Sequence, residues 1–157
     1  MNVPLYERIW IILMICVMGV FVVVLTVAAI GFGIQPPGST DFIAPEQVMS
    51  DPRTSPQGVQ EIEPGKYYEV RMAAFTFAFS PSEVRVPRGA TVTFILASTD
   101  VIHGIEIVGT NVNAMIIPGR ITRVTGKFDK PGTYLIICHE YCGIGHQAMQ
   151  STLEVEE

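Results

Sequence analysis

Two cysteines, two histidines and a methionine occur within the short stretch ICHEYCGIGHQAMQ, residues 137–150. The whole chain has only three cysteines and three histidines, so these residue types are concentrated here. Thiolate, imidazole and thioether groups are ligands that soft and borderline metal ions prefer in proteins. The stretch follows the apolar run GTYLIIC and contains Gly143 and Gly145, which is typical of a loop at the end of a strand. The residue types therefore indicate a metal-binding or redox-active loop.

The spacing of the candidate ligands favours copper over the other common metals. Cys138, Cys142, His146 and Met149 form a C-x3-C-x3-H-x2-M pattern, and His103 stands upstream in VIHGIEIV at an expected strand end. A structural zinc site uses four Cys or His ligands, which would leave Met149 idle. Iron–sulfur clusters usually need four cysteines. A distant His followed by a Cys–His–Met loop is typical of copper.

The second thiol is more than one blue-copper ion requires. Two thiolates, Cys138 and Cys142, can bridge two copper ions, with His103 and His146 binding one ion each. Met149 and a backbone carbonyl would then be weak outer ligands. Such a site leaves no open position for a substrate, so we expect it to carry electrons. Three alternatives stay open: a Cys138–Cys142 disulfide, one copper with a spare thiol, and zinc.

Two further soft side chains are not expected to bind the metal. His139 directly follows Cys138, and we expect its ring to point away from the cluster and to be solvated or hydrogen-bonded. Cys16 lies inside a long apolar run and is expected to be an inert thiol.

The N-terminal part of the chain predicts a membrane anchor. Residues 9–34 carry no charge and are long enough to cross a bilayer, whereas a signal peptide has a shorter apolar core. We therefore predict a retained transmembrane helix within residues 1–36. Arg8 precedes the run and the next basic residue is Arg53, so the positive-inside bias predicts a cytoplasmic N-terminus and an external domain.

The rest of the chain predicts a linker and one β domain. Residues 37–64 are rich in Pro, Gly and Ser, which indicates an extended, mobile linker with a short helix around residues 44–49. In residues 65–157, short apolar runs alternate with turns, which is typical of an all-β sandwich or barrel. The expected strands are YYEVRMAAFTF, EVRV, TVTFILAS, HGIEIV, AMII, ITRVTGKF, TYLIIC and STLEVEE.

The overall composition excludes one broad function class. The chain is 48% hydrophobic and 16% charged, which agrees with a membrane segment, and its formal net charge is −5. Nucleic-acid binding needs a basic patch, so no nucleic-acid partner is expected.

Several motifs together resemble a known family. DVIHG, GTN, VPRGATVTF and ICHEYCGIGHQAM are similar to the copper A domain of haem–copper oxidase subunit II. The single apolar helix resembles the ba-type, or B-family, cytochrome c oxidase subunit II. The resemblance covers residues 67–157 and, more weakly, the N-terminal helix. It implies a mainly β fold, a cupredoxin Greek-key barrel or sandwich, in a bacterial or archaeal plasma membrane.

The resemblance also implies a ligand set and a role. A binuclear copper A centre would be held by two bridging thiolates, two imidazoles, one thioether and one backbone carbonyl: Cys138, Cys142, His103, His146, Met149 and Glu140. Copper A accepts electrons from cytochrome c outside the membrane. It passes them to haem in the multi-span subunit I, where oxygen is reduced to water and protons are pumped. No catalytic residue is expected in this chain.

Supporting residues are expected around this centre. Asp100 is expected to hold the outer nitrogen of His103, because metal-bound imidazoles usually donate their other N–H to a fixed acceptor. Phe75, Phe77 and Phe79 form an aromatic run near the copper face. One or two of them are expected to be exposed for docking of the electron donor, and the others to be core residues.

The resemblance extends to partners and to a proton path. Glu7 in YERIW resembles the cytoplasmic start of the family's helix, where a glutamate stands at the mouth of a proton channel; an interface anchor is the alternative. Expected partners are subunit I, a small extra single-helix subunit, cytochrome c and membrane lipid. The alternative function is a freestanding membrane-anchored cupredoxin that shuttles electrons or carries copper. Nitrous-oxide reductase is disfavoured, because it needs a large propeller domain with many more histidines.

Overall fold

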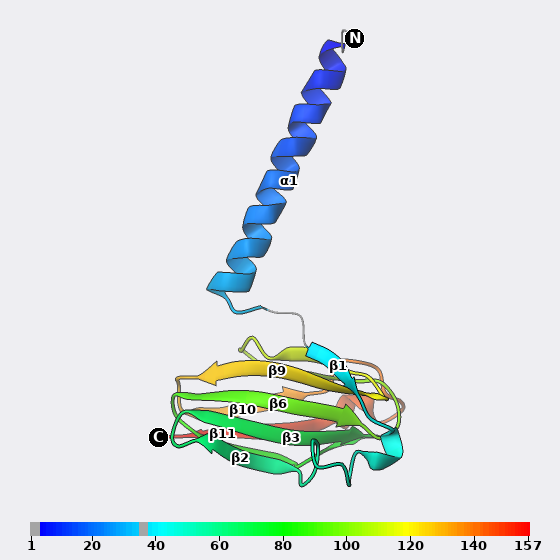
Figure 1. Cartoon of the computed structure of the whole chain (residues 1–157), viewed down its shortest axis with the longest axis vertical. Helices are drawn as coiled ribbons and strands as arrows, with labels where there is room; N and C mark the ends of the chain where they lie inside the picture. The colour runs from blue at the N-terminus through cyan, green and yellow to red at the C-terminus, as the bar shows by residue number, and fades with distance from the viewer. Residues whose placement is uncertain (1–3, 35–37) are drawn as a thin grey trace. The chain divides into compact units, whose positions relative to one another are not determined.

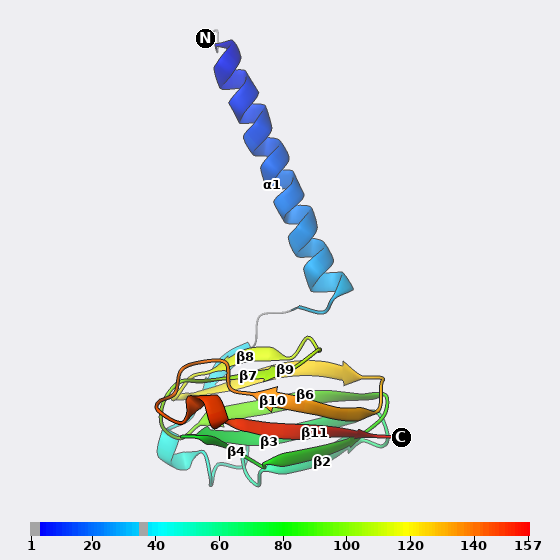
Figure 2. The ribbon, with the colours of Figure 1, turned by 180° about the vertical axis from the view of Figure 1, so that it is seen from behind.

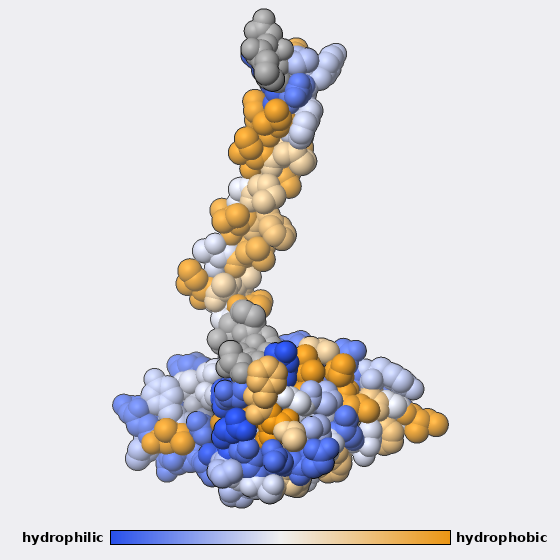
Figure 3. All heavy atoms as spheres, turned by 45° about the vertical axis from the view of Figure 1, so that its right-hand side comes forward, coloured by the Kyte–Doolittle hydropathy of each residue, from blue (hydrophilic) through white to orange (hydrophobic). Residues whose placement is uncertain are grey.

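The first compact unit of the chain is a long apolar helix. The structure is a computed structural model that describes residues 4–34 and 38–157, and the chain divides into units of residues 1–35 and 36–157. Helix α1 (Leu5–Gly31) has 27 residues, none of them buried (Figure 1). At about 1.5 Å per residue its length exceeds the hydrocarbon core of a bilayer, which is about 30 Å thick. Its visible surface is apolar over most of its length (Figure 3), so α1 is long and apolar enough to cross a membrane, as predicted.

The second unit is a sandwich of two sheets, counted over the described residues. The larger sheet has the order β1 (Gly38–Phe42), β9 (Arg120–Phe128), β6 (Ala90–Ser98), β3 (Tyr67–Phe75), β2 (Gly58–Glu63), and β4 (Ala78–Ser80) pairs with β3. The other sheet has the order β5 (Glu83–Pro87), β11 (Gln150–Glu156), β10 (Gly132–Ile137), β7 (His103–Ile107), β8 (Asn113–Ile116). Strand β3 runs parallel to β6 and β5 parallel to β11, and the other pairs are antiparallel. The larger sheet faces the viewer in Figure 1, and Figure 2 brings β10 and β11 forward.

The main core lies between the two sheets. Alternate residues of β6, Val92, Phe94 and Leu96, have no exposed area and belong to the same buried cluster as Ile105 and Ile136 of the facing sheet. This alternation follows from the two-residue period of a strand. The mainly β fold with one N-terminal helix, predicted from the spacing of short apolar runs, is confirmed.

The predicted linker differs from the structure. Residues 37–64 supply β1 and β2, the two edge strands of the larger sheet. Between these strands, Ile43 and Val48 are buried in a second apolar cluster with Ile95 and Ile121. This segment is therefore part of the folded domain, because it covers the outer face of the larger sheet. The short helix expected near residues 44–49 is present as the 3-10 helix η1 (Pro45–Gln47).

One end of the sandwich gathers the chain segments with candidate ligands. Strand β7 begins at His103, and the β10–β11 connection carries the cysteine loop and the 3-10 helix η2 (His146–Ala148). This connection is the orange-to-red loop beyond the ends of β10 and β11 in Figure 2. The turn between β3 and β4 lies against the same loop, because Phe77 contacts Gly143 and Gly145. The fold thus brings three distant segments to one place.

Candidate metal centre

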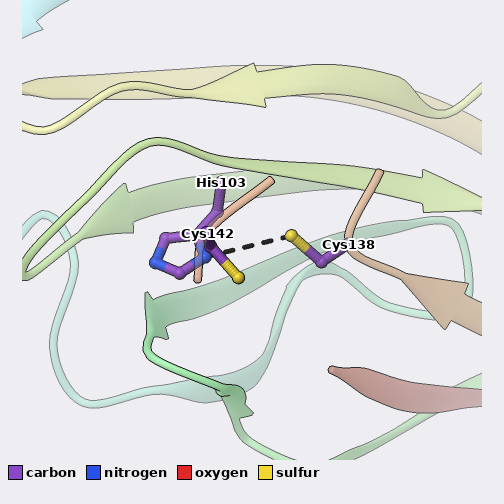
Figure 4. Close-up of side chains that lie close together, drawn as sticks. All are labelled: His103, Cys138 and Cys142. Carbon is purple, nitrogen blue, oxygen red and sulfur yellow. Dashed lines mark hydrogen bonds between the residues drawn. The ribbon is translucent and has the colours of Figure 1, made fainter. Parts of the chain in front are cut away.

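Three candidate ligands converge in a buried site. The ligand atoms of His103, Cys138 and Cys142 all lie within 4.8 Å of one another. Figure 4 shows the imidazole and the two sulfurs turned toward a common point, with His103 Nδ1 3.9 Å from Cys138 Sγ. The His103 side chain has no exposed area, and each cysteine is 6% exposed. Both cysteines are free thiols, so the structure gives no support to the alternative disulfide.

The other predicted ligands adjoin the same two thiols. His146 Nδ1 lies 3.7 Å from Cys142 Sγ, and Met149 Sδ lies 3.7 Å from the same sulfur. The backbone oxygen of Glu140 lies 3.3 Å from Cys138 Sγ. Each sulfur therefore has an imidazole Nδ1 of its own beside it, and one further weak donor. All six predicted ligand groups are brought together.

The two ends of the loop that carries these groups are held together by backbone hydrogen bonds, and we call this region the neck of the loop. Strands β10 and β11 stay in antiparallel register up to Ile137 opposite Gln150, and the Cys138 amide then donates to the Met149 carbonyl at 3.1 Å. At the far side, the ring of Phe77 lies 2.5 Å from the position that a Cβ on Gly145 would take. Glycine is needed there because only a residue without a side chain leaves room for the ring.

Asp100 fixes the orientation of one imidazole. Its Oδ1 lies 2.8 Å from His103 Nε2, and its carboxylate also accepts the backbone amides of Val101 at 2.6 Å and Thr76 at 2.7 Å. An N–H at Nε2 leaves the Nδ1 lone pair free to face the thiols. The geometry agrees with the predicted role of Asp100.

Comparisons with known proteins agree on one family. Residues 66–155 match the family described as "Cytochrome C oxidase subunit II, periplasmic domain". The chain is 37% identical over 156 residues to a cytochrome c oxidase subunit 2 of Thermus thermophilus, covering 97% of this chain and 92% of that protein. The chain belongs to the cytochrome c oxidase subunit II family. A second Thermus thermophilus subunit 2 is 40% identical over 84% of this chain and 98% of its own length.

A solved structure supports the family over nearly the whole length of this subunit II. A chain of a haem–copper terminal oxidase dimer aligns with a TM-score of 0.79 and 33% identity, covering 96% of this chain and 99% of its own. The Thermus relatives and the single helix agree with the expected ba-type. As a subunit II, this chain is part of an oxidoreductase complex whose oxygen-reducing site lies in subunit I. The freestanding shuttle is not favoured.

The donor set of this subunit II suits the copper that its family implies. Burial, followed by the neighbouring Cys138 thiol, raises the pKa of Cys142 to about 11, so the free thiol is protonated at neutral pH. A soft cation must displace that proton on binding. Two sulfurs, two imidazoles and a thioether in a site with little exposed area form a set typical of copper.

The acidity of Asp100 gives a testable pH dependence. Burial by itself would raise its pKa, but hydrogen bonds from His103 and the amides of Thr76 and Val101 outweigh burial and lower it from 3.8 to about 2. The ionised carboxylate therefore contributes stability above pH 3.8, and this contribution is lost as the pH falls to about 2. In denaturant titrations of the copper-free chain, the wild type should lose more stability over this interval than Asp100→Asn. Equal losses in the two proteins would contradict the assignment.

The aromatic run divides between core and surface. Phe79 is 3% exposed and Phe77 is 36% exposed, while Phe75 is half-buried. The strand expected at YYEVRMAAFTF, residues 67–77, is shorter in the structure, because β3 ends at Phe75 and a tight turn leads into β4. Phe79 is therefore a core residue, whereas Phe77 packs against Gly143 and Gly145 of the ligand loop and is still partly exposed.

The structure also shows exposed apolar residues that the sequence reasoning missed. Tyr141 is 76% and Ile144 is 87% exposed on the ligand loop, and Val101 and Ile102 are 42% and 44% exposed just before His103. We call these four residues the apolar rim. Their positions in the ligand motif could have indicated this exposure. A loop at the end of a β-sandwich lies outside the core, so these apolar side chains are exposed.

His139 is placed differently from its prediction. Its ring packs against Gly104, and it is not one of the side chains whose ligand atoms gather around the two thiols. The ring was expected to be solvated or hydrogen-bonded, but its Nε2 is buried and has no hydrogen-bond partner among the described residues. Glu7 lies in the first turn of α1, and its role in proton uptake stays a prediction.

Proposed function

We propose that this subunit accepts electrons for the oxidase through a binuclear copper A centre. The proposed ligands are the side chains of His103, Cys138, Cys142, His146 and Met149 and the backbone carbonyl of Glu140. The observation that carries the proposal is that both thiols lie in one buried cluster and each has a separate imidazole Nδ1 beside it, at 3.9 and 3.7 Å. A single blue-copper ion needs only one thiolate, so the one-copper alternative does not explain why both thiols lie beside an imidazole Nδ1.

The protein's own residues supply a rigid and mostly dry site. Bound copper supplies a one-electron carrier. The thiols, Met149 and His103 are nearly or completely buried, which keeps water away from the bound charge. The neck between β10 and β11 and the carboxylate of Asp100 hold the ligands in place. A site that moves little when its charge changes favours fast electron transfer.

The proposal includes a place in the membrane. Helix α1 would anchor the subunit beside the haem-bearing subunit I, with the N-terminus in the cytoplasm of a bacterium or archaeon and the copper domain outside. This orientation is supported by Arg8 before the apolar run and by the lack of any basic residue after the run until Arg53. A small single-helix subunit and membrane lipid would complete the surroundings of α1, and Glu7 would lie at the mouth of a proton path.

Two measurements test the proposed function. The detergent-solubilised chain should bind two copper ions, and its mixed-valence spin-resonance spectrum should show one spin shared by two copper nuclei. One copper with a single-nucleus signal would exclude the binuclear centre. Purification from native membranes should recover a haem-bearing multi-span partner with the chain; its absence would favour the freestanding shuttle.

Met149 is expected to tune the centre without being required for it. Met149→Leu should retain both copper ions but raise the reduction potential, because loss of the thioether donor destabilises the oxidised state. The residue is 2% exposed and leucine has a similar volume, so the fold should tolerate the change. Voltammetry of the copper-loaded chain measures the shift. Met72→Leu, the same substitution at a core residue that is 1% exposed, should leave the potential unchanged.

The apolar rim is the proposed docking surface for cytochrome c. Its residues belong to the two loops that supply the ligands, and Tyr141 contacts the His146 ring edge-on at 5.9 Å between centroids. Ile144→Lys should raise the KM for reduced cytochrome c by about tenfold, the effect of losing about 1.4 kcal/mol at an interface. Stopped-flow reduction of the assembled oxidase measures this. Ile62→Lys, at a 58% exposed residue of the edge strand β2, is the matched control and should have no effect.

A further inference from the structure

We propose that His139 is a positioning residue whose ring, seated on Gly104, sets the spacing between the strands that carry His103 and Cys138. Each member of this pair directly adjoins one ligand in the sequence. The inference rests on the proposed copper function, but it concerns contacts within this chain. We call the pair the His139–Gly104 lock.

The register of the sheet places the two residues opposite each other. Strands β7 and β10 pair antiparallel at Ile136 with Ile107 and at Ile137 with Glu106. Continuing this register by two residues brings His139 opposite Gly104, yet the pairing stops at Ile137. The two strands therefore separate at the level of the ligands.

The ring of His139 fills the space that the missing side chain leaves. A Cβ on Gly104 would lie 2.5 Å from His139 Nδ1 and 2.6 Å from Nε2, closer than side-chain atoms approach each other. Gly104 is not among the glycines with positive φ, so its backbone would accept alanine. Glycine is therefore needed at position 104 to make room for the His139 ring and not for an unusual backbone conformation.

The chemistry of the ring also indicates a steric role. The Nε2 atom is enclosed and has no hydrogen-bond partner among the described residues. A buried polar atom without a partner is unfavourable, so hydrogen bonding by Nε2 does not explain why the ring lies there, and its packing on Gly104 does. Because His139 follows Cys138 and Gly104 follows His103, a shift of either residue changes the 3.9 Å separation of His103 Nδ1 and Cys138 Sγ.

A double-mutant cycle in the full-length, detergent-solubilised chain tests the lock. The variants are Gly104→Ala, His139→Ala and the double variant. The readouts are the rate of copper loss to a chelator, the spin-resonance spectrum of the copper-loaded chain and the unfolding temperature of the copper-free chain. Gly104→Ala should accelerate copper loss by about tenfold or more, as for other residues that orient metal ligands, and should change the spectrum. In the His139→Ala background the same substitution should change the rate by less than about twofold, because the clash is gone.

Gly126→Ala is the matched control for a general packing defect. A Cβ there would lie 2.5 Å from Val112 Cγ2, a comparable overlap between β9 and a core residue of another segment. This variant should lower the unfolding temperature but leave copper loss and the spectrum unchanged. A Gly104→Ala penalty of equal size in both backgrounds would overturn the lock, as would a Gly126→Ala effect on copper equal to that of Gly104→Ala.

The cycle separates failure of the lock from failure of the proposed function. A wild-type chain that takes up no copper would refute the copper function. The lock would then still be tested by the unfolding temperatures of the copper-free variants. They support it if Gly104→Ala destabilises only when His139 is present, and overturn it otherwise.

Discussion

Cys142→Ser is expected to abolish the binuclear centre. The Cys142 sulfur lies beside both His146 Nδ1 and Met149 Sδ, each at 3.7 Å, so its loss removes the donor around which half of the ligand set gathers. A serine hydroxyl is a poor ligand for copper beside soft donors. The copper content should fall from two ions to at most one per chain, and the shared-spin signal should disappear.

Cys16→Ser is the matched control for this substitution. Cys16 is an exposed thiol of α1 and lies in a different compact unit from the ligand loop. This variant should keep the full copper content and spectrum. A Cys142→Ser chain that retained two copper ions with a shared spin would show that the second thiol does not bridge.

Asp100→Ala is expected to produce the second-largest effect. The substitution leaves His103 Nε2 without its acceptor in a side chain that has no exposed area. An unpartnered buried donor costs about 1–3 kcal/mol of folding stability, and loss of a residue that orients a metal-bound imidazole typically lowers metal affinity by about 10–100-fold. Competition with a copper chelator and urea denaturation measure the two effects.

A surface aspartate provides the control for Asp100. Asp129 pairs with Lys127 at 2.8 Å, but both side chains are more than 60% exposed. Exposed pairs of this kind contribute about 0–1 kcal/mol. Asp129→Ala should leave copper binding unchanged, and a comparable loss in both variants would argue against a specific role for Asp100.

The grouping of the candidate ligands in one loop could be predicted from the sequence because the information there is local. One connection between strands, β10–β11, carries Cys138, Cys142, His146 and Met149. Their residue types restrict the choice of metal independently of the rest of the fold. Asp100 could be paired with His103 because the two residues are three positions apart at a strand end, where a side chain can reach back along the chain.

The features that the sequence did not predict depend on tertiary contacts. Ile43 and Val48 lie in short apolar groups, FIA and VM, among turn formers, so no strand or helix period marks them. Their burial depends on the outer face of a sheet formed by residues later in the chain. The His139–Gly104 contact depends on register between two strands that are far apart in the sequence. Phe77 was assigned to a strand because alternation alone does not reveal where a strand turns back.

The sheet order also imposes a sequence of events on the synthesis of the subunit. Strand β11 follows all the other described strands in the sequence, yet it lies between β5 and β10 in its sheet, and Met149 directly precedes it. The neck of the ligand loop closes only when β11 pairs with β10. The donors can therefore be held in their final arrangement only after β11 has been made and has paired, so stable binding of copper depends on the strand that follows the ligand loop.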